Sequence, residues 1–334
     1  MDNSTYSMVL ETSEKLFAGC GGDGFDPALW SAAEEAGFPL ALLREENGGF
    51  GFSAREAFAP VRVAAARAVA LPLGETLLAN WVLSQAGLGS LDGPLALAWA
   101  GVEAVPFGRH LRAVVRLSEL DGGVGLSLIH TTADLWNPGT NHAGEARDSL
   151  IVQEPTAPQA RIAMSPVALR ALMSTLRTVQ MAGAIEAVAD MCLRYCNERE
   201  QFGRALGKFQ VIQHQLAILA TQSCAATVAA DMALAAFEAL MTQGEEVFVL
   251  TAAAAKLRTA EAATAAASIA HQVHGAIGFS EEYSLHLLTR RLWAWRDEDG
   301  SESQWAEYLA NWAQNQPERG LWPALTACDL AKVA

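Results

Sequence analysis

Residues 165–210 read SPVALRALMSTLRTVQMAGAIEAVADMCLRYCNEREQFGRALGKFQ, and this stretch decides the fold. Ser165-Pro166 is a helix-start signal, because a serine side chain caps the first backbone N–H groups and proline is tolerated at the first helical position. From there to about residue 199 the sequence has no further proline and no helix break except Gly183. The stretch therefore predicts one long helix that ends near Arg199.

Two more long helices are predicted after it, at about 208–241 and 245–274, with Gln243-Gly244 as the turn between them. Helices of this length with short connections pack as an antiparallel bundle, and frequent alanines let their backbones approach closely. The fold class is therefore predicted to be mainly α, with a C-terminal helical bundle over residues 161–334.

The residues before the bundle show two different patterns of apolar side chains. Residues 1–90 carry apolar side chains at helical spacing, which predicts a small N-terminal helical domain. Residues 91–160 contain short β-like runs, of which 111–120 and 124–130 form the clearest hairpin candidate, and a last strand is predicted at 149–153. This middle part is predicted to be a reduced β-domain that depends on its neighbours for burial.

The chain is acidic, since its 334 residues carry 23 basic and 37 acidic side chains and a formal net charge of −14. Such a surface repels phosphate backbones and anionic lipid, which argues against nucleic acid or a membrane surface as the main partner. No uninterrupted apolar run reaches the roughly 18 residues of a membrane span, and no secretory signal is recognisable. Five irregularly spaced cysteines suit a reducing compartment, so a cytoplasmic location is expected.

Three segments carry residues suited to chemistry, each with a plain structural alternative. Arg199 and Arg204 place guanidinium groups, which match phosphate oxygens, at a helix end, although solvated arginines at a capped end look the same. Gly275 and Ala276 remove side-chain bulk after a helix, as glycines at any helix end do. The segment 297–299 has three acidic residues, which is typical of a solvated loop or of a general base in a cleft.

Together these segments resemble the acyl-CoA dehydrogenase family over about 177–304. The resemblance is carried by the Arg-x-Gln-Phe-Gly run with a following Phe-Gln pair, by the Gln-x-His-Gly-x-x-Gly-Phe run and by the Arg290-Arg291 doublet, in family order and spacing. It implies a flavoenzyme with an N-terminal helical domain, a middle β-domain and a C-terminal four-helix bundle, usually a dimer of dimers with FAD across a subunit interface.

The resemblance also implies roles for particular residues. Arg199 and Gln201 would meet the FAD pyrophosphate, and Phe209 and Gln210 would line its adenosine end. A second group would contact the FAD of the neighbouring subunit: Gln272, Gly275 and Ala276. Ser301 falls where a hydroxyl usually touches FAD, and Asp299 falls where the family has its catalytic glutamate. The implied reaction is α,β-desaturation of an acyl-CoA thioester, with electrons passed to an electron-transfer flavoprotein.

Two departures keep a second hypothesis open. Asp299 is one methylene shorter than glutamate, and the stretch 90–165 contains neither of the family's two flavin-holding motifs. Shortened chains of this type resemble subunits of the heteromeric acyl-CoA dehydrogenases of bacterial steroid side-chain degradation. The alternative is therefore a non-catalytic subunit that completes the FAD site of a homologous partner in a heterotetramer, and a flavin-free helical scaffold is the third option. No metal is expected, since no third ligand accompanies His271 and His274 at a diagnostic spacing.

Overall fold

The computed structural model describes residues 3–101, 104–151 and 157–315, and the chain divides into two compact units. The first comprises residues 1–64 and 69–169, and the second comprises residues 65–68 and 170–334. The second unit begins close to the predicted start of the C-terminal bundle at residue 161. The three-part division at 90 and 160 stays a prediction.

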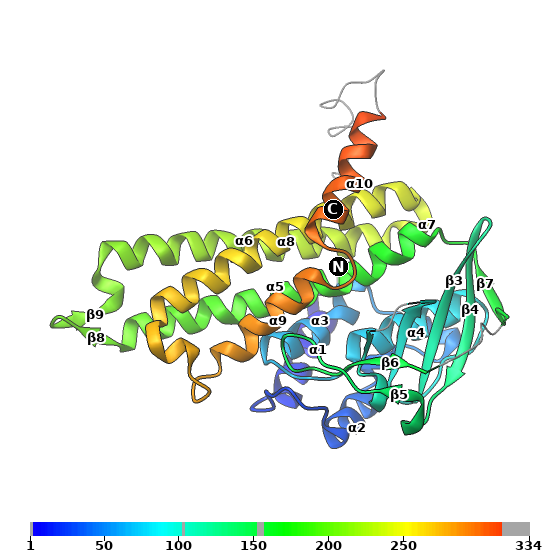
Figure 1. Ribbon diagram of the computed structural model, residues 1–334, viewed down its shortest axis with the longest axis horizontal. Coiled ribbons are helices and arrows are strands. Elements are labelled where there is room, and N and C mark those ends of the chain that lie inside the picture. The colour runs from blue at the N-terminus through cyan, green and yellow to red at the C-terminus, as the bar shows by residue number, and fades with distance from the viewer. Residues whose placement is uncertain (1–2, 102–103, 152–156, 316–334) are drawn as a thin grey trace. The chain divides into compact units, whose positions relative to one another are not determined.

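The first unit combines helices with two small sheets (Figure 1). Its helices are α1 (Asn3–Leu16), α2 (Pro27–Glu35), α3 (Ala54–Ala66) and α4 (Leu73–Gln85). Its strands are β1 (Leu95–Trp99), β2 (Val105–Pro106), β3 (Ala113–Leu120), β4 (Gly123–His130), β5 (Trp136–Asn137), β6 (Arg147–Leu150) and β7 (Ala160–Ile162). Helix α4 is buried over most of its length and packs on β1, which is buried at all five positions.

The predicted hairpin is confirmed as β3 and β4, paired antiparallel from Leu120 with Gly123 to Ala113 with His130. These strands form the centre of a sheet in the order β1-β3-β4-β7, with β1 parallel to β3. A smaller sheet has the order β2-β6-β5. The strand predicted at 149–153 begins earlier, at Arg147, and residues 152–156 lie outside the described part of the chain. The reduced middle sheet is thus present as predicted.

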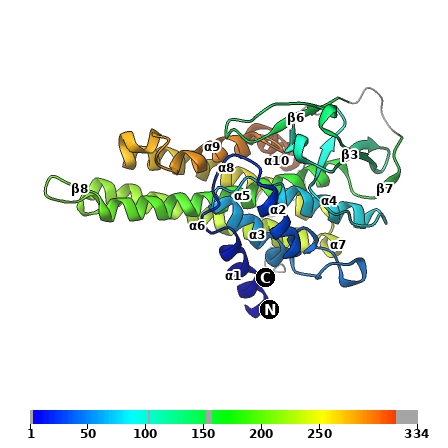
Figure 2. The same cartoon turned by 90° about the horizontal axis from the view of Figure 1, so that it is seen from below.

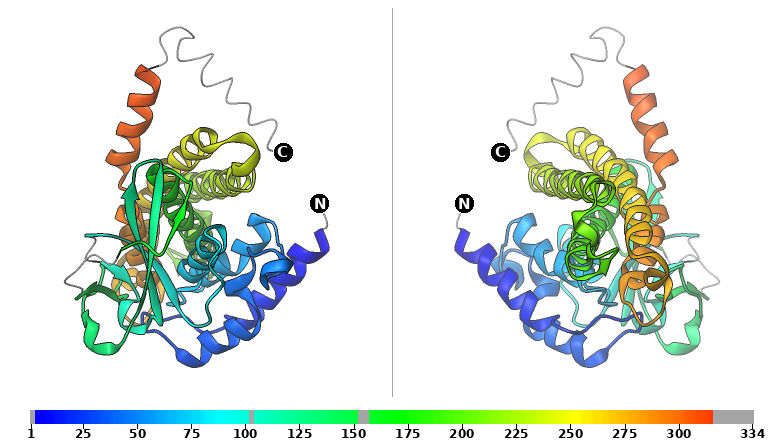
Figure 3. Two further views of the ribbon diagram at one scale, coloured as in Figure 1. Left: turned by 90° about the vertical axis from the view of Figure 1, so that its right-hand side faces the viewer. Right: turned by 90° about the vertical axis from the view of Figure 1, so that its left-hand side faces the viewer.

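The second unit is the predicted bundle. Its long helices are α5 (Pro166–Glu198), α6 (Gln210–Glu238) and α8 (Glu245–His274), joined by the short α7 (Leu240–Gln243) and followed by α9 (Leu285–Asp297) and α10 (Glu302–Gln314). The long helices run side by side in Figures 1 and 2, and Figure 3 shows them nearly end-on. Helix α8 packs on α6, α9 and α10, and buried alanines such as Ala252, Ala260 and Ala266 permit this close packing.

Candidate functional site

The segment after α5 forms a small projecting hairpin rather than a plain turn. Strands β8 (Glu200–Gln201) and β9 (Arg204–Ala205) pair antiparallel, and Phe202 and Gly203 connect them with φ angles of 52° and 80°. Two successive residues with positive φ are the signature of a type I′ turn, which matches the twist of a two-stranded ribbon. The hairpin lies at one end of the bundle in Figure 1.

Aromatic and guanidinium groups gather on this hairpin. The Arg204 guanidinium lies 4.1 Å from the centre of the Phe209 ring, and the Phe202 ring meets Phe209 edge-on at 6.3 Å. Phe202 is 91% exposed, and Arg199 and Gln201 are exposed beside it. A cation, an amide and an uncovered aromatic ring on one small surface are suited to a ligand that has both phosphate and ring groups.

The second predicted segment begins where α8 ends. Gln272, Gly275 and Ala276 are exposed, and Gly275 has a φ of 62°, which only glycine adopts without strain. A Cβ atom added at Gly275 would meet open space, so the backbone conformation and not crowding within this chain requires glycine there. Phe279, four residues further on, is 72% exposed and stacks on His271 at 4.4 Å. The end of α8 is thus another uncovered surface of amide and small side chains.

These two surfaces lie at the same end of the bundle because α5 and α8 are joined by a buried histidine. The His274 ring stacks on Tyr195 of α5 at 4.4 Å, and its Nε2 atom is 3.1 Å from the Tyr283 hydroxyl. Burial lowers the pKa of His274. His271 also has a protein partner, since its Nε2 atom lies 3.0 Å from Oγ1 of Thr289.

The third predicted segment is a turn between α9 and α10. Nε of Arg177, a side chain only 2% exposed, donates to Oδ2 of Asp299 at 2.8 Å and lies 3.3 Å from Oε2 of Glu298. Asp299 has a φ of 55°, and a Cβ at Gly300 would lie 2.3 Å from Nε1 of Trp305. The turn therefore needs glycine at position 300 and holds the carboxylate of Asp299 against a buried guanidinium.

A fully buried lysine lies beneath this turn. Nζ of Lys256 donates to the carbonyl oxygen of Trp295 at 2.6 Å and to that of Glu298 at 2.7 Å. Burial lowers the pKa of Lys256 to about 7, against the opposing effect of Asp299. Neither Lys256 nor Arg177 was among the residues proposed from the sequence. The signal for Lys256 was its place among alanines on α8, since its neighbours Ala252 and Ala260, four residues away on the same face, are both buried.

The proposed residues lie on several elements of the second unit. Arg199 and Gln201 follow the end of α5, Phe209 and Gln210 mark the start of α6, and Gln272, Gly275 and Ala276 lie at the end of α8. Asp299 and Ser301 lie in the turn between α9 and α10. Lys256, which donates to the carbonyl of Glu298 in this turn, precedes His274 by 18 residues on α8, or about 27 Å of helix. One chain therefore does not bring all of these residues around one point.

Ser301 has a structural role that the sequence reading did not include. It is the N-cap residue of α10, where its hydroxyl accepts from the backbone N–H of Gln304 and its own backbone N–H donates to Oε1 of the Gln304 side chain. We expect Ser301→Ala to lower the free energy of unfolding by about 1 kcal/mol, measured by urea denaturation. Ser301→Asn should preserve the cap but remove the hydroxyl, so a loss of FAD binding in both variants, with stability lost only in the alanine variant, would assign the hydroxyl to FAD.

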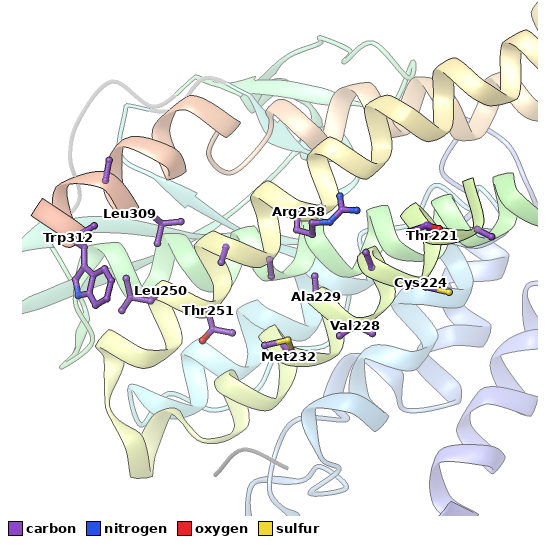
Figure 4. Close-up of a pocket in the computed structure, with 16 residues that line it drawn as sticks. Thr221, Cys224, Val228, Ala229, Met232, Leu250, Thr251, Arg258, Leu309 and Trp312 are labelled. Atoms are coloured by element: carbon purple, nitrogen blue, oxygen red, sulfur yellow. The ribbon is translucent and has the colours of Figure 1, made fainter. Parts of the chain in front are cut away.

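A large apolar groove lies elsewhere in this unit, between α6, α8 and α10 (Figure 4). Its volume is about 1130 Å³, and its lining includes Cys224, Val228, Met232, Leu250, Arg258 and Trp312. None of the residues proposed from the sequence lines it. Helix α6 is the one helix in the described residues that is long and apolar enough to cross a membrane by length and composition, with a mean hydropathy of 1.3. Only 28% of its most apolar stretch is buried, so much of this apolar helix is uncovered.

Comparisons with known proteins agree with this architecture. Residues 166–310 match the family described as acyl-CoA dehydrogenase, C-terminal domain. Acyl-CoA dehydrogenase IpdE2 of Mycobacterium tuberculosis is 25% identical over 279 residues, which cover 80% of this chain and 81% of that protein.

Two solved structures have the same fold. The Tcur3481-Tcur3483 steroid ACAD variant has a TM-score of 0.81 at 19% identity, with 94% of this chain and 98% of that chain covered. The ChsE4-ChsE5 complex from Mycobacterium tuberculosis has a TM-score of 0.76 at 19% identity, with 92% and 96% covered. At this identity the likeness shows the fold alone.

Proposed function

From the premise that this chain belongs to the acyl-CoA dehydrogenase family, we propose that it takes part in the FAD-dependent α,β-desaturation of an acyl-CoA thioester. The observation that carries the proposal is the pair of uncovered surfaces at one end of the bundle. One presents Arg199 and Gln201 on a projecting hairpin, and the other presents Gln272 beside Gly275. Such exposed polar groups and a positive-φ glycine fit a dinucleotide held between two chains.

The donor chemistry of the first surface fits FAD. The Arg199 guanidinium and the Gln201 amide supply donors for the pyrophosphate, while Phe209 and Gln210 supply an aromatic face and an amide for the adenosine end. Gln272, Gly275 and Ala276 are proposed to contact the FAD bound mainly by the other chain. When bound, FAD supplies an acceptor for the hydride that leaves the β-carbon of the acyl group.

The turn between α9 and α10 supplies the proposed base. Desaturation requires removal of a proton from the carbon next to the thioester carbonyl, and a positioned carboxylate can accept it. Asp299 is proposed for this role because Arg177 fixes one of its oxygens and the turn is held by buried contacts. A fixed carboxylate lowers the cost of bringing base and substrate together.

We expect Arg199→Ala to weaken FAD binding by about 10- to 100-fold, because it removes charge-assisted hydrogen bonds to the pyrophosphate. Isothermal titration of the assembled protein, stripped of flavin, with FAD measures this. Arg44→Ala is the matched control, since Arg44 is a 79% exposed arginine of the first unit and the charge change is identical. Equal FAD affinity in both variants would show that Arg199 does not hold the pyrophosphate, and no FAD binding by the wild type or either variant would favour the flavin-free scaffold.

A specific observation supports the second candidate function, a non-catalytic subunit that completes the FAD site of a homologous partner. Arg177 already engages Oδ2 of the shorter Asp299, and the sequence between 90 and 165 lacks the motifs that hold the flavin ring. The ratio of FAD to chains in the native assembly distinguishes the two functions. One FAD per chain, with turnover by this chain alone, supports the enzyme, and FAD retained only after co-expression with a homologous chain supports the subunit.

We propose that the assembly is a dimer of dimers, homomeric or heteromeric, and that the groove between α6, α8 and α10 is covered by another chain. The uncovered apolar length of α6 and the two-chain complexes among the similar structures support this. The steroid ACAD among them supports a sterol side-chain thioester as one substrate class. Transfer of electrons to an electron-transfer flavoprotein and a cytoplasmic location complete the proposal.

A further inference from the structure

Lys256 occupies an unusual position for a lysine, because its side chain is completely buried yet carries an ammonium group. Both of its acceptors are main-chain carbonyl oxygens, of Trp295 and Glu298, at 2.6 and 2.7 Å. Trp295 lies in the last turn of α9, where carbonyl groups have no partner within the helix, and Glu298 is the C-cap residue. A cation here satisfies these carbonyl groups and complements the negative end of the helix dipole.

The same turn is held from two other directions. Arg177 donates to the carboxylate of Asp299, and Nε1 of Trp305 donates to the main-chain carbonyl of Asp299 at 3.3 Å. Asp299 itself has the left-handed φ of 55°, a conformation that a non-glycine residue keeps only when its surroundings fix it. Nζ of Lys256 donates to the main-chain carbonyl of Glu298, the residue immediately before Asp299. It therefore fixes the peptide group that links Glu298 to the strained Asp299.

We propose that Lys256 is a positioning residue: its ammonium fixes the turn at residues 295–299 and thereby orients the Asp299 carboxylate for proton abstraction. The inference rests on the proposed function, since it deepens the role given to Asp299. Lys256 touches neither substrate nor cofactor in this proposal, and it acts only through the main chain. The charged groups that act on it come from the turn and from the helices on either side: Asp297, Glu298, Asp299 and Arg177.

The position of Lys256 predicts an unusual response to pH. Burial lowers its pKa to about 7, so the ammonium loses its proton as the pH rises through 7, and its hydrogen bonds to the carbonyls lose their charge assistance. The fixed turn is therefore expected to loosen above pH 7. The folded pKa lies below the unfolded value of about 10.4, so the unfolded chain binds more protons between these values. The contribution of Lys256 to the free energy of unfolding therefore rises as the pH increases from about 7 to about 10.4.

Opposite trends distinguish positioning from a merely structural role. If Lys256 only stabilised the fold, α-proton exchange and resistance to denaturant would change together with pH. The proposal instead expects α-proton exchange by the wild type to fall above pH 7 while the contribution of Lys256 to stability increases. Exchange is measured with a non-desaturating acyl-CoA analogue on the FAD-loaded native assembly, as deuterium uptake from solvent.

The variant Lys256→Met tests the residue directly, because methionine has a similar length and no charge. We expect at least a tenfold loss of exchange rate at pH 6, an unchanged KM for the analogue, unchanged FAD content and no fall in exchange near pH 7. The matched control is Lys15→Met, at a 75% exposed lysine of the first unit, which should behave as the wild type. A Lys256→Met variant with the wild-type rate and the wild-type pH profile would overturn the proposal.

A second measurement keeps the proposal separate from the proposed function. The amide nitrogen chemical shifts of Asp299 and Gly300 in the intact protein should titrate with a midpoint near 7 in the wild type and stay flat in Lys256→Met. If this titration occurs but the wild type shows no exchange, the catalytic role of Asp299 fails and the anchoring by Lys256 stands. If Lys256→Met does not fold, the wild-type titration alone decides, and flat shifts would overturn the anchoring.

Discussion

Replacing Asp299 by asparagine is expected to slow α-proton exchange of a bound acyl-CoA by about two to four orders of magnitude, the usual contribution of a general base. The amide cannot accept the proton, but its carbonyl oxygen can still accept the hydrogen bond from Arg177, so the turn should keep its shape. FAD should stay bound, because Ser301 is the only proposed FAD contact in this turn and its capping bonds at the start of α10 do not involve Asp299. Deuterium exchange and flavin absorbance, measured on the same sample, check both expectations.

The neighbouring carboxylate provides the matched control for this variant. Glu298 also approaches the Arg177 guanidinium, at 3.3 Å, and Glu298→Gln removes the same charge from the same turn. We expect the glutamine variant to retain most of the exchange rate. If Glu298→Gln abolishes exchange and Asp299→Asn does not, the base is Glu298. If neither variant loses exchange, neither Glu298 nor Asp299 is the base, and the non-catalytic subunit is favoured.

The second large effect concerns stability. We expect Arg177→Met to lower the free energy of unfolding by about 3 kcal/mol, because breaking a buried ion pair leaves the remaining carboxylate without its partner. Arg177 is 2% exposed and Asp299 is 17% exposed, so solvent screens the pair little. Guanidinium chloride denaturation of the native assembly, followed by far-UV circular dichroism, measures the loss.

A double-mutant cycle separates the ion pair from the packing of the arginine stem. In the background of Asp299→Asn, the further change Arg177→Met should cost at least 1 kcal/mol less than it costs in the wild type, because the charge interaction with Asp299 is already absent. Equal costs in both backgrounds would show that the negative charge of Asp299 adds nothing to its interaction with Arg177. The contacts of Arg177 with Gln180, at 2.8 Å, and with Glu298, at 3.3 Å, are present in both backgrounds.

The elements that the sequence predicted well are those set by local patterns. Ser165-Pro166 marked the start of α5 because capping and proline geometry depend on adjacent residues, and the helix begins at Pro166 as predicted. Gln243-Gly244 likewise marked the break before α8, and Gly244 has the positive φ that favours glycine. The reduced sheet followed from the alternating runs on each side of Gly122.

The contacts that the sequence could not predict join distant residues. Arg177 and Asp299 are 122 residues apart, and Lys256 reaches carbonyl groups about 40 residues away, so no local periodicity contains these pairs. The hairpin after α5 was missed for another reason: Phe202 takes a positive φ, which a bulky residue rarely does and which a sequence reading does not assign to it. The roles of the FAD-contacting residues remain predictions from family resemblance.

The uncovered apolar length of α6 has a practical consequence for handling the protein. A polypeptide that exposes such a long apolar helix to water should aggregate, or be bound by chaperones, when it is expressed without its partner chains. Low yield of soluble material from a single-chain preparation would then reflect a missing companion and not a failure to fold.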